Sequence, residues 1–229
     1  MAVKQLTFGR AAIADVRLEH VELQGRDGLA ITLVHDGKQW PVALHLIGDH
    51  NATNAAGAFA MGIALGFTPN ECVRGLEAAQ AHARRLEVKD APGGVTVIDD
   101  CYNANPASMG VALDALSGLA VESRAIAVLG DMLELGADEA AQHSLIGVKA
   151  SDQVALIAFF GERMKVAHTQ AAKKLKKNAR HFLEIEPLVA WLKGELRPGD
   201  VVLVKGSRGM KLERVVEALT GTADARGGH

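Results

Sequence analysis

The sequence predicts an α/β protein whose larger part is a doubly wound, mostly parallel sheet. From residue 95 onward, short and nearly continuous apolar strands alternate with helical segments, the pattern of a parallel sheet covered on both faces. Before that point, segments of strand-like alternation come first and helical periodicity follows. We therefore expect a small antiparallel sheet with helices, followed by the parallel sheet.

The first part begins with the pattern of antiparallel strands over residues 13–46. Two apolar runs, 29–34 and 39–44, are separated by Asp36-Gly37, which is a strong signal for a hairpin turn. The sequence therefore predicts that these two runs pair with each other.

Two helices should follow these strands. Residues 51–66 are rich in alanine and end at Gly66, a residue suited to closing a helix. The next helix is expected from Thr68 to about residue 83, because Thr68, Pro69 and Glu71 supply an N-cap, a first-turn proline and an acid at the third position.

The second part repeats strand and helix. Segment 83–94, which contains Pro92-Gly93-Gly94, is expected to be a loop at the boundary between the parts. We also expect residues 222–229, a Gly-rich polar end, to fray. The expected strands are 95–98, 125–129, 154–160, 180–183 and 201–204, and the expected helices lie near 106–119, 138–151, 162–175, 186–196 and 209–219.

Composition argues against several classes of protein. A net charge of −2 and an aromatic content of 4% argue against a nucleic-acid-binding surface. Cys72 and Cys101 lie far apart and give neither a disulfide framework nor a zinc spacing, which fits a reducing compartment. For Cys101 we favour a small residue filling a tight turn over a reactive thiol. With no apolar stretch long enough for a bilayer, the chain is expected to be soluble and cytoplasmic.

Polar side chains concentrate immediately after residues 95–98. The run Asp99-Asp100-Cys101-Tyr102-Asn103-Ala104-Asn105-Pro106 holds two carboxylates and two carboxamides at the carboxyl end of a predicted strand. Open α/β sheets bind ligands at that end. A turn that only caps the next helix needs one such residue, so we favour a binding site over a cap.

Two more predicted strands end in polar loops that contain glycine. Gly130-Asp131-Met132-Leu133-Glu134-Leu135-Gly136 follows one, and Lys205-Gly206-Ser207-Arg208-Gly209 follows another and suits an anionic group. Because parallel strands share one carboxyl edge, we expect Asp100, Asp131 and Ser207 along a common rim. His143, in the helix after the first loop, is interpreted as a partly buried helix residue, not a catalytic base.

The first part carries a separate polar cluster, Gly48-Asp49-His50-Asn51-Ala52-Thr53-Asn54. Asn51 and Asn54 are three residues apart at a helix start, so their amides should project to the same side and could read a nucleobase edge. A plain N-cap at Asp49 or Asn51 is the alternative, and we weigh the two equally. Further on, Arg84-Arg85 could hold a phosphate, although a surface location is the usual alternative.

Two phosphate-binding motifs are missing from the sequence. There is no G-x-x-x-x-G-K-[ST] phosphate loop, and no G-x-G-x-x-G follows a predicted strand. We therefore do not expect the parallel sheet to bind NAD or FAD.

Taken in order, the motifs resemble those of the Mur ligases, the ATP-dependent amide ligases of peptidoglycan synthesis. The resemblance extends over nearly the whole chain, and the strings after residues 98 and 129 favour the branch that adds D-alanyl-D-alanine to UDP-N-acetylmuramoyl-tripeptide. One departure is Arg84, where the family has glycine. The matching runs are Gly48 to Asn54, Arg85-Leu86-Glu87, Asp99 to Pro106, Gly130 to Gly136 and Lys205 to Arg208.

The resemblance implies a particular domain organisation. Family members have a UDP-sugar domain, a central ATPase domain and a C-terminal Rossmann-like domain. Residues 1–82 resemble the last part of the central ATP-binding domain, and residues 83–229 resemble the C-terminal domain. The phosphate loop and most magnesium ligands would then lie upstream, and the chain alone is expected to be inactive.

The resemblance also implies roles for individual residues. ATP binding would involve Asn51, Asn54, Arg85, Asp100, Asn103 and Asn105. Binding of D-alanyl-D-alanine would involve Asp131, Lys205, Ser207 and Arg208. ATP and Mg²⁺ are implied for the full-length enzyme, with no metal ligand in this chain, and the reaction would pass through an acyl phosphate. We expect a monomer with no nucleic-acid or membrane partner.

Other functions remain open at this stage. The chain could belong to another Mur-type ligase or to an enzyme resembling folylpolyglutamate synthase. It could also be a module that binds a small anion without catalysis.

Overall fold

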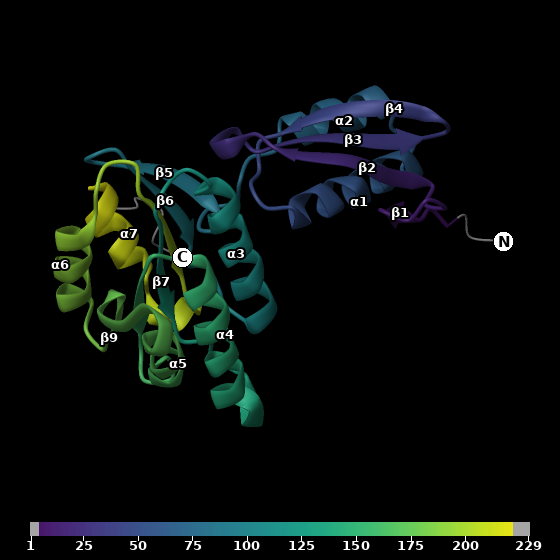
Figure 1. The fold of residues 1–229 in the computed structure, drawn as a ribbon. Coiled ribbons are helices and arrows are strands. Elements are labelled where there is room, and N and C mark those ends of the chain that lie inside the picture. Colours follow the sequence, from purple (N-terminus) through teal and green to yellow (C-terminus); the bar gives the residue numbers. More distant parts are fainter. Residues whose placement is uncertain (1–4, 222–229) are drawn as a thin grey trace. The chain divides into compact units, whose positions relative to one another are not determined.

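The computed structural model describes residues 5–221, and the chain divides after Ala81 into two compact units (Figure 1). The Gly-rich end that was predicted to fray lies outside the described residues. Within residues 5–221, no helix is long and apolar enough to cross a membrane.

The first unit contains a four-stranded sheet in the order β1-β2-β3-β4. Strands β2 (Val16–Leu23), β3 (Leu29–His35) and β4 (Lys38–Leu44) pair antiparallel, as the sequence predicts. The two-residue strand β1 (Phe8–Gly9) was not predicted and pairs parallel with β2, so the sheet is mixed.

The hairpin between β3 and β4 turns at Asp36 and Gly37, with φ values of 49° and 71°. Two consecutive positive φ values are what the tightest two-residue hairpin requires, and an Asp-Gly pair supplies them at little cost. The turn signal in the sequence is thereby confirmed.

Two helices belong to the first unit, and both have the predicted end signals. Helix α1 (His50–Ala64) closes with Gly66 at φ 92°, and the N–H groups of Gly66 and Phe67 donate back to the carbonyls of Ile63 and Gly62. Helix α2 (Pro69–Glu77) begins with the predicted capping box between Thr68 and Glu71.

Helix α2 is shorter than predicted, because it ends at Glu77 and not near residue 83. The residues that follow Leu76 are small or polar and give a further turn nothing large to bury. A helix continues mainly where it has a face to pack, so high alanine content alone did not extend this one. The core of the unit lies between α1 and the sheet, and it includes Phe59, Leu33 and Ile31.

The second unit contains a six-stranded sheet in the order β5-β6-β10-β7-β8-β9. The five strands from β6 to β9 in this order are mutually parallel, and β5 pairs antiparallel with β6. Their bounds are β5 Glu87–Ala91, β6 Val95–Asp100, β7 Ala125–Gly130, β8 Leu156–Phe160, β9 Ala179–Phe182 and β10 Val201–Lys205.

The predicted loop over residues 83–94 is wrong in part, since Glu87–Ala91 forms β5. Gly93 and Gly94, at φ 81° and 73°, lie in the turn between β5 and β6 and do not mark a domain boundary. Strand β5 lies at the edge of the sheet. Its charged residues resemble those of a loop, so the sequence did not indicate a strand there.

Helices cover both faces of the parallel sheet. Helices α3 (Pro106–Leu119), α4 (Glu139–Gln153) and α5 (Lys165–Leu175) lie on one face, and α6 (Ile185–Glu195) and α7 (Glu213–Thr220) lie on the other (Figure 1). The doubly wound α/β class is confirmed. The predicted helix at 209–219 is shifted, because a 3₁₀ turn (Arg208–Met210) and a left-handed Lys211 precede α7.

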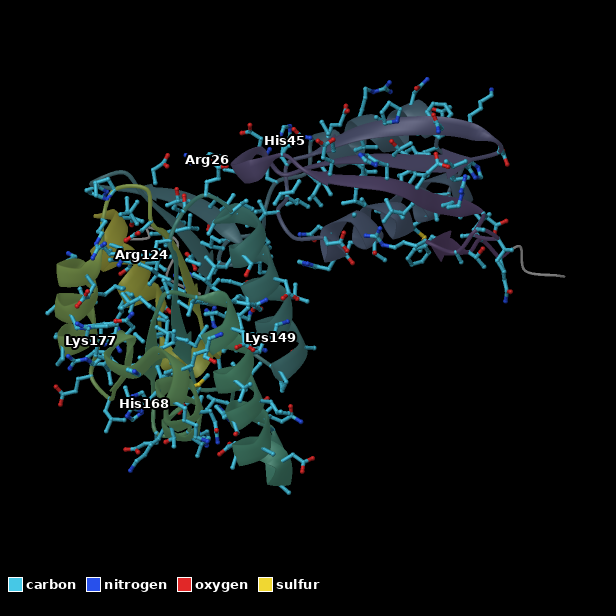
Figure 2. All side chains as sticks on the ribbon, in the orientation of Figure 1. Arg26, His45, Arg124, Lys149, His168 and Lys177 are labelled. Carbon is cyan, nitrogen blue, oxygen red and sulfur yellow. The ribbon has the colours of Figure 1, made fainter. Side chains whose placement is uncertain are left out.

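Buried apolar strands form the centre of this unit. Ile98, Ile126 and Leu203 have no exposed surface. Arg124, labelled in Figure 2, precedes β7 and donates two hydrogen bonds, at 2.9 and 2.7 Å, to the carboxylate of Asp200 just before β10. This pair fixes the start of both strands and leaves their carboxyl ends as the open edge.

Candidate functional site

The carboxyl ends of β6, β10 and β7 form a rim where the direction of winding changes. Strand β10 lies between β6 and β7, but the helix after it, α7, covers the opposite face from α3 and α4. The loops after these three strands therefore diverge, and such a switch point is where α/β sheets bind ligands. The expectation that Asp100, Asp131 and Ser207 share one rim is confirmed by the contacts between their loops.

A buried ion pair joins the ends of β6 and β10. Lys205 Nζ lies 2.6 Å from Asp100 Oδ2, and the two side chains are 3% and 12% exposed. The ammonium also donates to the carbonyl of Asn103 at 2.9 Å, and Asp100 Oδ1 accepts from the N–H of Leu86 at 3.1 Å. Burial raises the pKa of Asp100, and the charge of Lys205 acts in the opposite direction. The carboxylate is therefore held in place from two sides.

The neighbouring carboxylate, Asp99, has a structural role on the other face of the strand. It accepts hydrogen bonds from Lys89 Nζ at 2.6 Å and from the thiol of Cys101 at 2.7 Å. Burial and the nearby Asp99 raise the pKa of the Cys101 thiol far above its ordinary range. The interpretation of Cys101 as a small residue in a tight turn therefore agrees with its environment.

Ser207 connects the three loops of the rim. Its N–H donates to the carbonyl of Asp131 at 3.0 Å, its hydroxyl accepts from the N–H of Leu133 at 2.9 Å, and the same hydroxyl donates to the carbonyl of Ala104 at 3.3 Å. The side chain is 4% exposed. Ser207 thus fixes the loops after β6 and β7 to the loop after β10.

Two glycines bring the loops after β7 and β10 into direct contact. A Cβ atom on Gly206 would lie 3.1 Å from Gly130 Cα and 2.8 Å from Leu212 Cδ1. A Cβ atom on Gly130 would also lie 2.8 Å from Leu212 Cδ1. At Gly206 the close backbone atom of Gly130 favours glycine, whereas at Gly130 the closest atom belongs to the end of the Leu212 side chain, which would have to shift to admit a Cβ atom.

Asp131 was predicted to bind substrate, and its described contacts lie within the fold. Its Oδ1 accepts from the N–H of Met164 at 2.8 Å, just before α5, and the carboxylate packs against Gly161. Burial raises the pKa of Asp131. A direct substrate contact by Asp131 stays a prediction, and the contacts give it a role in holding the turn before α5.

His143 is completely buried, consistent with its interpretation as a structural helix residue. Its Nε2 accepts from the N–H of Met132 at 3.0 Å, and its Nδ1 lies 2.8 Å from the carbonyl of Glu139. This arrangement places the ring proton on Nδ1 and gives the imidazole a structural role in the loop after β7.

The exposed part of the rim centres on Tyr102, the only tyrosine in the chain. Arg85 Cζ lies 4.4 Å from the centroid of its ring and Arg208 Cζ lies 5.5 Å from it. The ring of His82 meets it edge-on at 6.0 Å. The sequence placed Arg85 and Arg208 among candidate site residues, but it gave Tyr102 no role. A single tyrosine inside a polar run is the signal that could have revealed it.

The two predicted asparagines of this rim are both exposed. Asn105 caps α3: its Oδ1 accepts from the N–H of Ser108 at 2.8 Å, so the capping alternative is correct for this one residue. Asn103 Oδ1 accepts from the N–H of Ala104 at 2.9 Å. ATP contacts by Asn103 and Asn105 stay predictions.

Arg84 adopts the backbone conformation that its position demands. Its φ is 62°, a left-handed value that glycine adopts freely and arginine rarely does. Its carbonyl accepts from the N–H of Tyr102 at 3.1 Å, and its guanidinium lies 3.4 Å from Glu213 Oε1. The turn at Arg84 therefore has the backbone conformation that glycine, the residue implied by the resemblance, would favour.

In the first unit, Asn51 and Asn54 lie on the same side of α1, as predicted. Asn54 Nδ2 donates to Asn51 Oδ1 at 3.2 Å, and Asn51 Nδ2 donates to the carbonyl of Ile47 at 2.8 Å. Asp49 occupies the N-cap position without a capping hydrogen bond and instead forms an ion pair with Arg10 at 2.6 Å. Binding of adenine by the pair stays a prediction.

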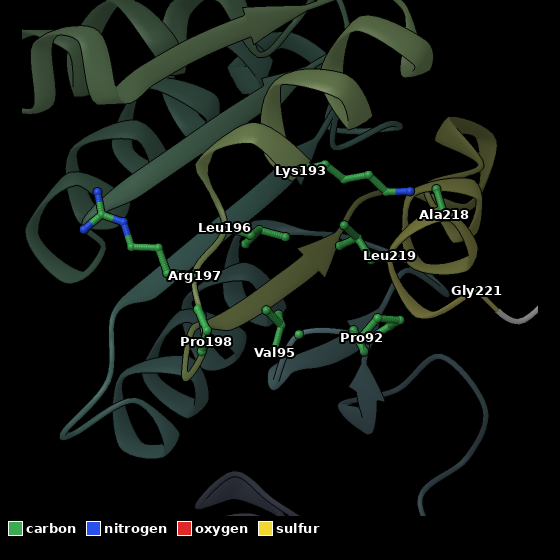
Figure 3. A pocket seen from close by; sticks show the side chains of 11 residues that line it. Pro92, Val95, Lys193, Leu196, Arg197, Pro198, Ala218, Leu219 and Gly221 are labelled. Atoms are coloured by element: carbon green, nitrogen blue, oxygen red, sulfur yellow. The ribbon is translucent and has the colours of Figure 1, made fainter.

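One cavity of about 400 Å³ in the second unit lies away from the rim (Figure 3). Its lining includes Val95 and Pro198, at or next to the amino ends of β6 and β10. It is therefore at the opposite end of the strands from Asp100 and Lys205. Among residues 5–221, no group of three or more His, Cys, Asp or Glu side chains could hold a metal ion.

Comparison with known proteins connects this rim to one family. Residues 84–208 match the family described as Mur ligase, glutamate ligase domain. The UDP-N-acetylmuramoyl-tripeptide–D-alanyl-D-alanine ligases of Bacillus subtilis and Mycobacterium tuberculosis are 33% and 36% identical, over 93% and 95% of this chain. A crystal structure of MurF from Acinetobacter baumannii has a TM-score of 0.80 at 29% identity, over 95% of this chain and 47% of that one. The chain spans about half the length of the curated relatives, 46% and 47%.

Proposed function

This chain belongs to the Mur ligase family, and on that premise we propose that it is part of an ATP-dependent ligase. The proposed reaction joins D-alanyl-D-alanine to UDP-N-acetylmuramoyl-tripeptide in peptidoglycan synthesis. The observation that carries the proposal is the rim at the switch point, where the loops after β6, β10 and β7 are fixed together. The names of the relatives that align with nearly all of the chain supply the substrates.

The proposed chemistry has two steps. The terminal carboxylate of the tripeptide attacks the γ-phosphorus of ATP, and ADP leaves, which gives an acyl phosphate. The amine of D-alanyl-D-alanine then attacks the acyl carbon, and phosphate leaves as the amide forms. Positioning and charge neutralisation supply most of the catalysis in phosphoryl transfer. Mg²⁺ belongs to the proposal for the full-length enzyme, and we propose no ligand for it in this chain.

We assign the nucleotide to the residues of both units that the sequence singled out. Asp100, held by Lys205 and the N–H of Leu86, would accept hydrogen bonds from the ribose hydroxyls. Arg85 is exposed and would approach the phosphates. In the first unit, Asn51 and Asn54 would contact adenine, and in the second unit Asn103 and Asn105 are proposed as further ATP-binding residues.

We assign the dipeptide to the loop after β10. Arg208 is exposed and its guanidinium matches a carboxylate. Lys205 and Ser207 are buried and bonded within the fold, so in this proposal they act mainly by holding the loop that carries Arg208. Asp131 would support the same loop, because its carbonyl accepts from the N–H of Ser207.

The remaining proposals follow from the family. Residues 1–82 correspond to the last part of the central ATP-binding domain, and residues 83–229 correspond to the C-terminal domain. The protein would act in the cytoplasm as a monomer, and the 229-residue chain alone would not turn over substrate.

A chimera tests the function. The matching half of the Bacillus subtilis relative is replaced by this chain, and ADP release is measured with ATP and UDP-N-acetylmuramoyl-tripeptide. We expect release that depends on D-alanyl-D-alanine and is lost in the Arg85→Ala chimera, which removes an exposed arginine assigned to the phosphates. An Arg180→Ala chimera, altered at an exposed arginine on β9, is the matched control. Release that depends instead on L-alanine, D-glutamate or a diamino acid would contradict the assigned acceptor.

A further inference from the structure

Tyr102 brings together two arginines that are 123 positions apart in the sequence. The distances from its ring centroid, 4.4 Å to Arg85 Cζ and 5.5 Å to Arg208 Cζ, limit the separation of the two Cζ atoms to about 10 Å. A guanidinium over an aromatic ring is attracted by the negative face of the ring. The ring therefore offsets part of the repulsion between two cations that lie within about 10 Å of each other.

Neither arginine has a carboxylate partner among residues 5–221. The nearby carboxylates are bonded elsewhere: Asp100 to Lys205, Asp99 to Lys89 and Glu213 to Arg84. Arg85 and Arg208 are both exposed. The rim therefore presents two guanidinium groups to an incoming ligand while its negative charges are turned into the fold.

The backbone that carries the ring is held by its neighbours. The N–H of Tyr102 donates to the carbonyl of Arg84 at 3.1 Å, and the preceding residue, Cys101, is buried. Ser207, next to Arg208, is bonded to the loops after β6 and β7. Both arginines thus extend from anchored backbone, and the ring restricts the remaining freedom of their side chains.

From this geometry we infer that Tyr102 is a positioning residue that holds Arg85 and Arg208 as one binding site for a phosphate group. A guanidinium binds phosphate through two parallel N–H donors, and two guanidiniums match a doubly charged anion. Holding both before the ligand arrives reduces the entropy lost on binding. The identification of the phosphate as that of a nucleotide rests on the proposed function. The inferred site contains both Arg85, assigned above to ATP, and Arg208, assigned above to D-alanyl-D-alanine.

The test uses the 229-residue chain and two probes, inorganic phosphate and ADP. The arginine Nε–Hε signals are followed by NMR during each titration. We expect the Arg85 and Arg208 signals to shift together with one dissociation constant for phosphate. Arg85→Ala and Arg208→Ala should each weaken phosphate binding about tenfold, and the double variant should weaken it by less than the product of the two.

Two substitutions at Tyr102 separate positioning from bulk. Tyr102→Phe keeps the ring and should bind phosphate nearly as well as the parent chain. Tyr102→Leu removes the ring and should weaken phosphate binding about threefold. The chemical-shift changes of the Arg85 and Arg208 signals should then differ more from each other than in the parent chain. Arg180→Ala, on β9, is the matched control for loss of one exposed positive charge. Circular dichroism of every variant verifies that the fold is intact.

The outcomes distinguish this inference from the proposed function. If phosphate and ADP shift Arg85 alone, and Arg208→Ala has no effect, the single site is refuted while nucleotide binding stands. If both arginines respond to phosphate but ADP does not bind, the site stands and the nucleotide assignment falls. Equal affinity of Tyr102→Leu and Tyr102→Phe would refute the positioning role.

Discussion

The buried pair of Asp100 and Lys205 makes a quantitative prediction about the stability of the second unit. Its side chains are 12% and 3% exposed, so water solvates neither charge well. Removing one partner of such a pair leaves the other charge buried and uncompensated, which costs about 3–5 kcal/mol. Lys205→Met, which keeps the length and apolar stem of the side chain, should therefore lower the free energy of unfolding by about 3 kcal/mol.

Substituting either partner of the pair should lower the free energy of unfolding by a similar amount, and substituting both should lower it much less. Asp100→Asn keeps an acceptor for the N–H of Leu86 but leaves the ammonium with only neutral partners, so it should also cost about 3 kcal/mol. The double variant has no charge at these two buried positions, and we expect it to be within about 1 kcal/mol of the parent chain. The two single effects should therefore be strongly non-additive.

Acidic pH provides a second check on the same variant. In Lys205→Met, the charge that opposes the effect of burial is gone, so the pKa of Asp100 in the folded state rises further above its unfolded value. The folded state then binds a proton more tightly than the unfolded state does. The loss of unfolding free energy in Lys205→Met should be complete above that pKa and should become smaller as pH falls through it.

The measurement is urea unfolding followed by tryptophan fluorescence. Trp191 lies on α6 in the second unit and packs on Phe182, whereas Trp40 lies on β4 in the first unit. In a Trp40→Phe background, the signal therefore reports the second unit alone. Additive effects of the two single substitutions, or a loss of less than about 1 kcal/mol in Lys205→Met, would refute the uncompensated-charge argument.

Two further predictions concern other buried groups. Gly161→Ala should lower the free energy of unfolding by at least about 2 kcal/mol, because φ is 105° and the new Cβ would lie 2.5 Å from the carboxylate of Asp131. Gly199→Ala, at φ 87° with open space around it, is the control and should cost only about 1 kcal/mol in urea unfolding. In thiol labelling of the folded chain, Cys72 should react and Cys101 should not, because burial raises the pKa of the Cys101 thiol more strongly. Labelling of folded Cys72→Ser would contradict this difference.

Local signals predicted much of the fold. Helix α3 runs over Pro106–Leu119, the predicted range, because Asn105 and Pro106 give an unambiguous start. The parallel strands were found because each is a short apolar run between helices. Strand β5 was missed because its pairing with β6 is a tertiary contact, and its charged residues gave no local sign of it.

The candidate site was predictable as a location but not as a set of roles. The topology rule places the loops after parallel strands at one edge, and that sufficed to gather Asp100, Asp131 and Ser207. Their partners depend on contacts across more than thirty positions, such as Met164 for Asp131 and Lys205 for Asp100. No local pattern determines which of several polar residues will be buried and which will face solvent.

The contact between Gly130 and Gly206 has a consequence for which positions of the rim tolerate substitution. The two loops approach each other this closely because each glycine has only a hydrogen atom in place of a side chain, and Leu212 packs against both positions. Any larger residue at either position must wedge the loops apart or displace that leucine. Substitutions that change the proposed ligand site without disturbing the fold are therefore expected at flanking, solvent-facing positions such as Arg208 and not between the two loops.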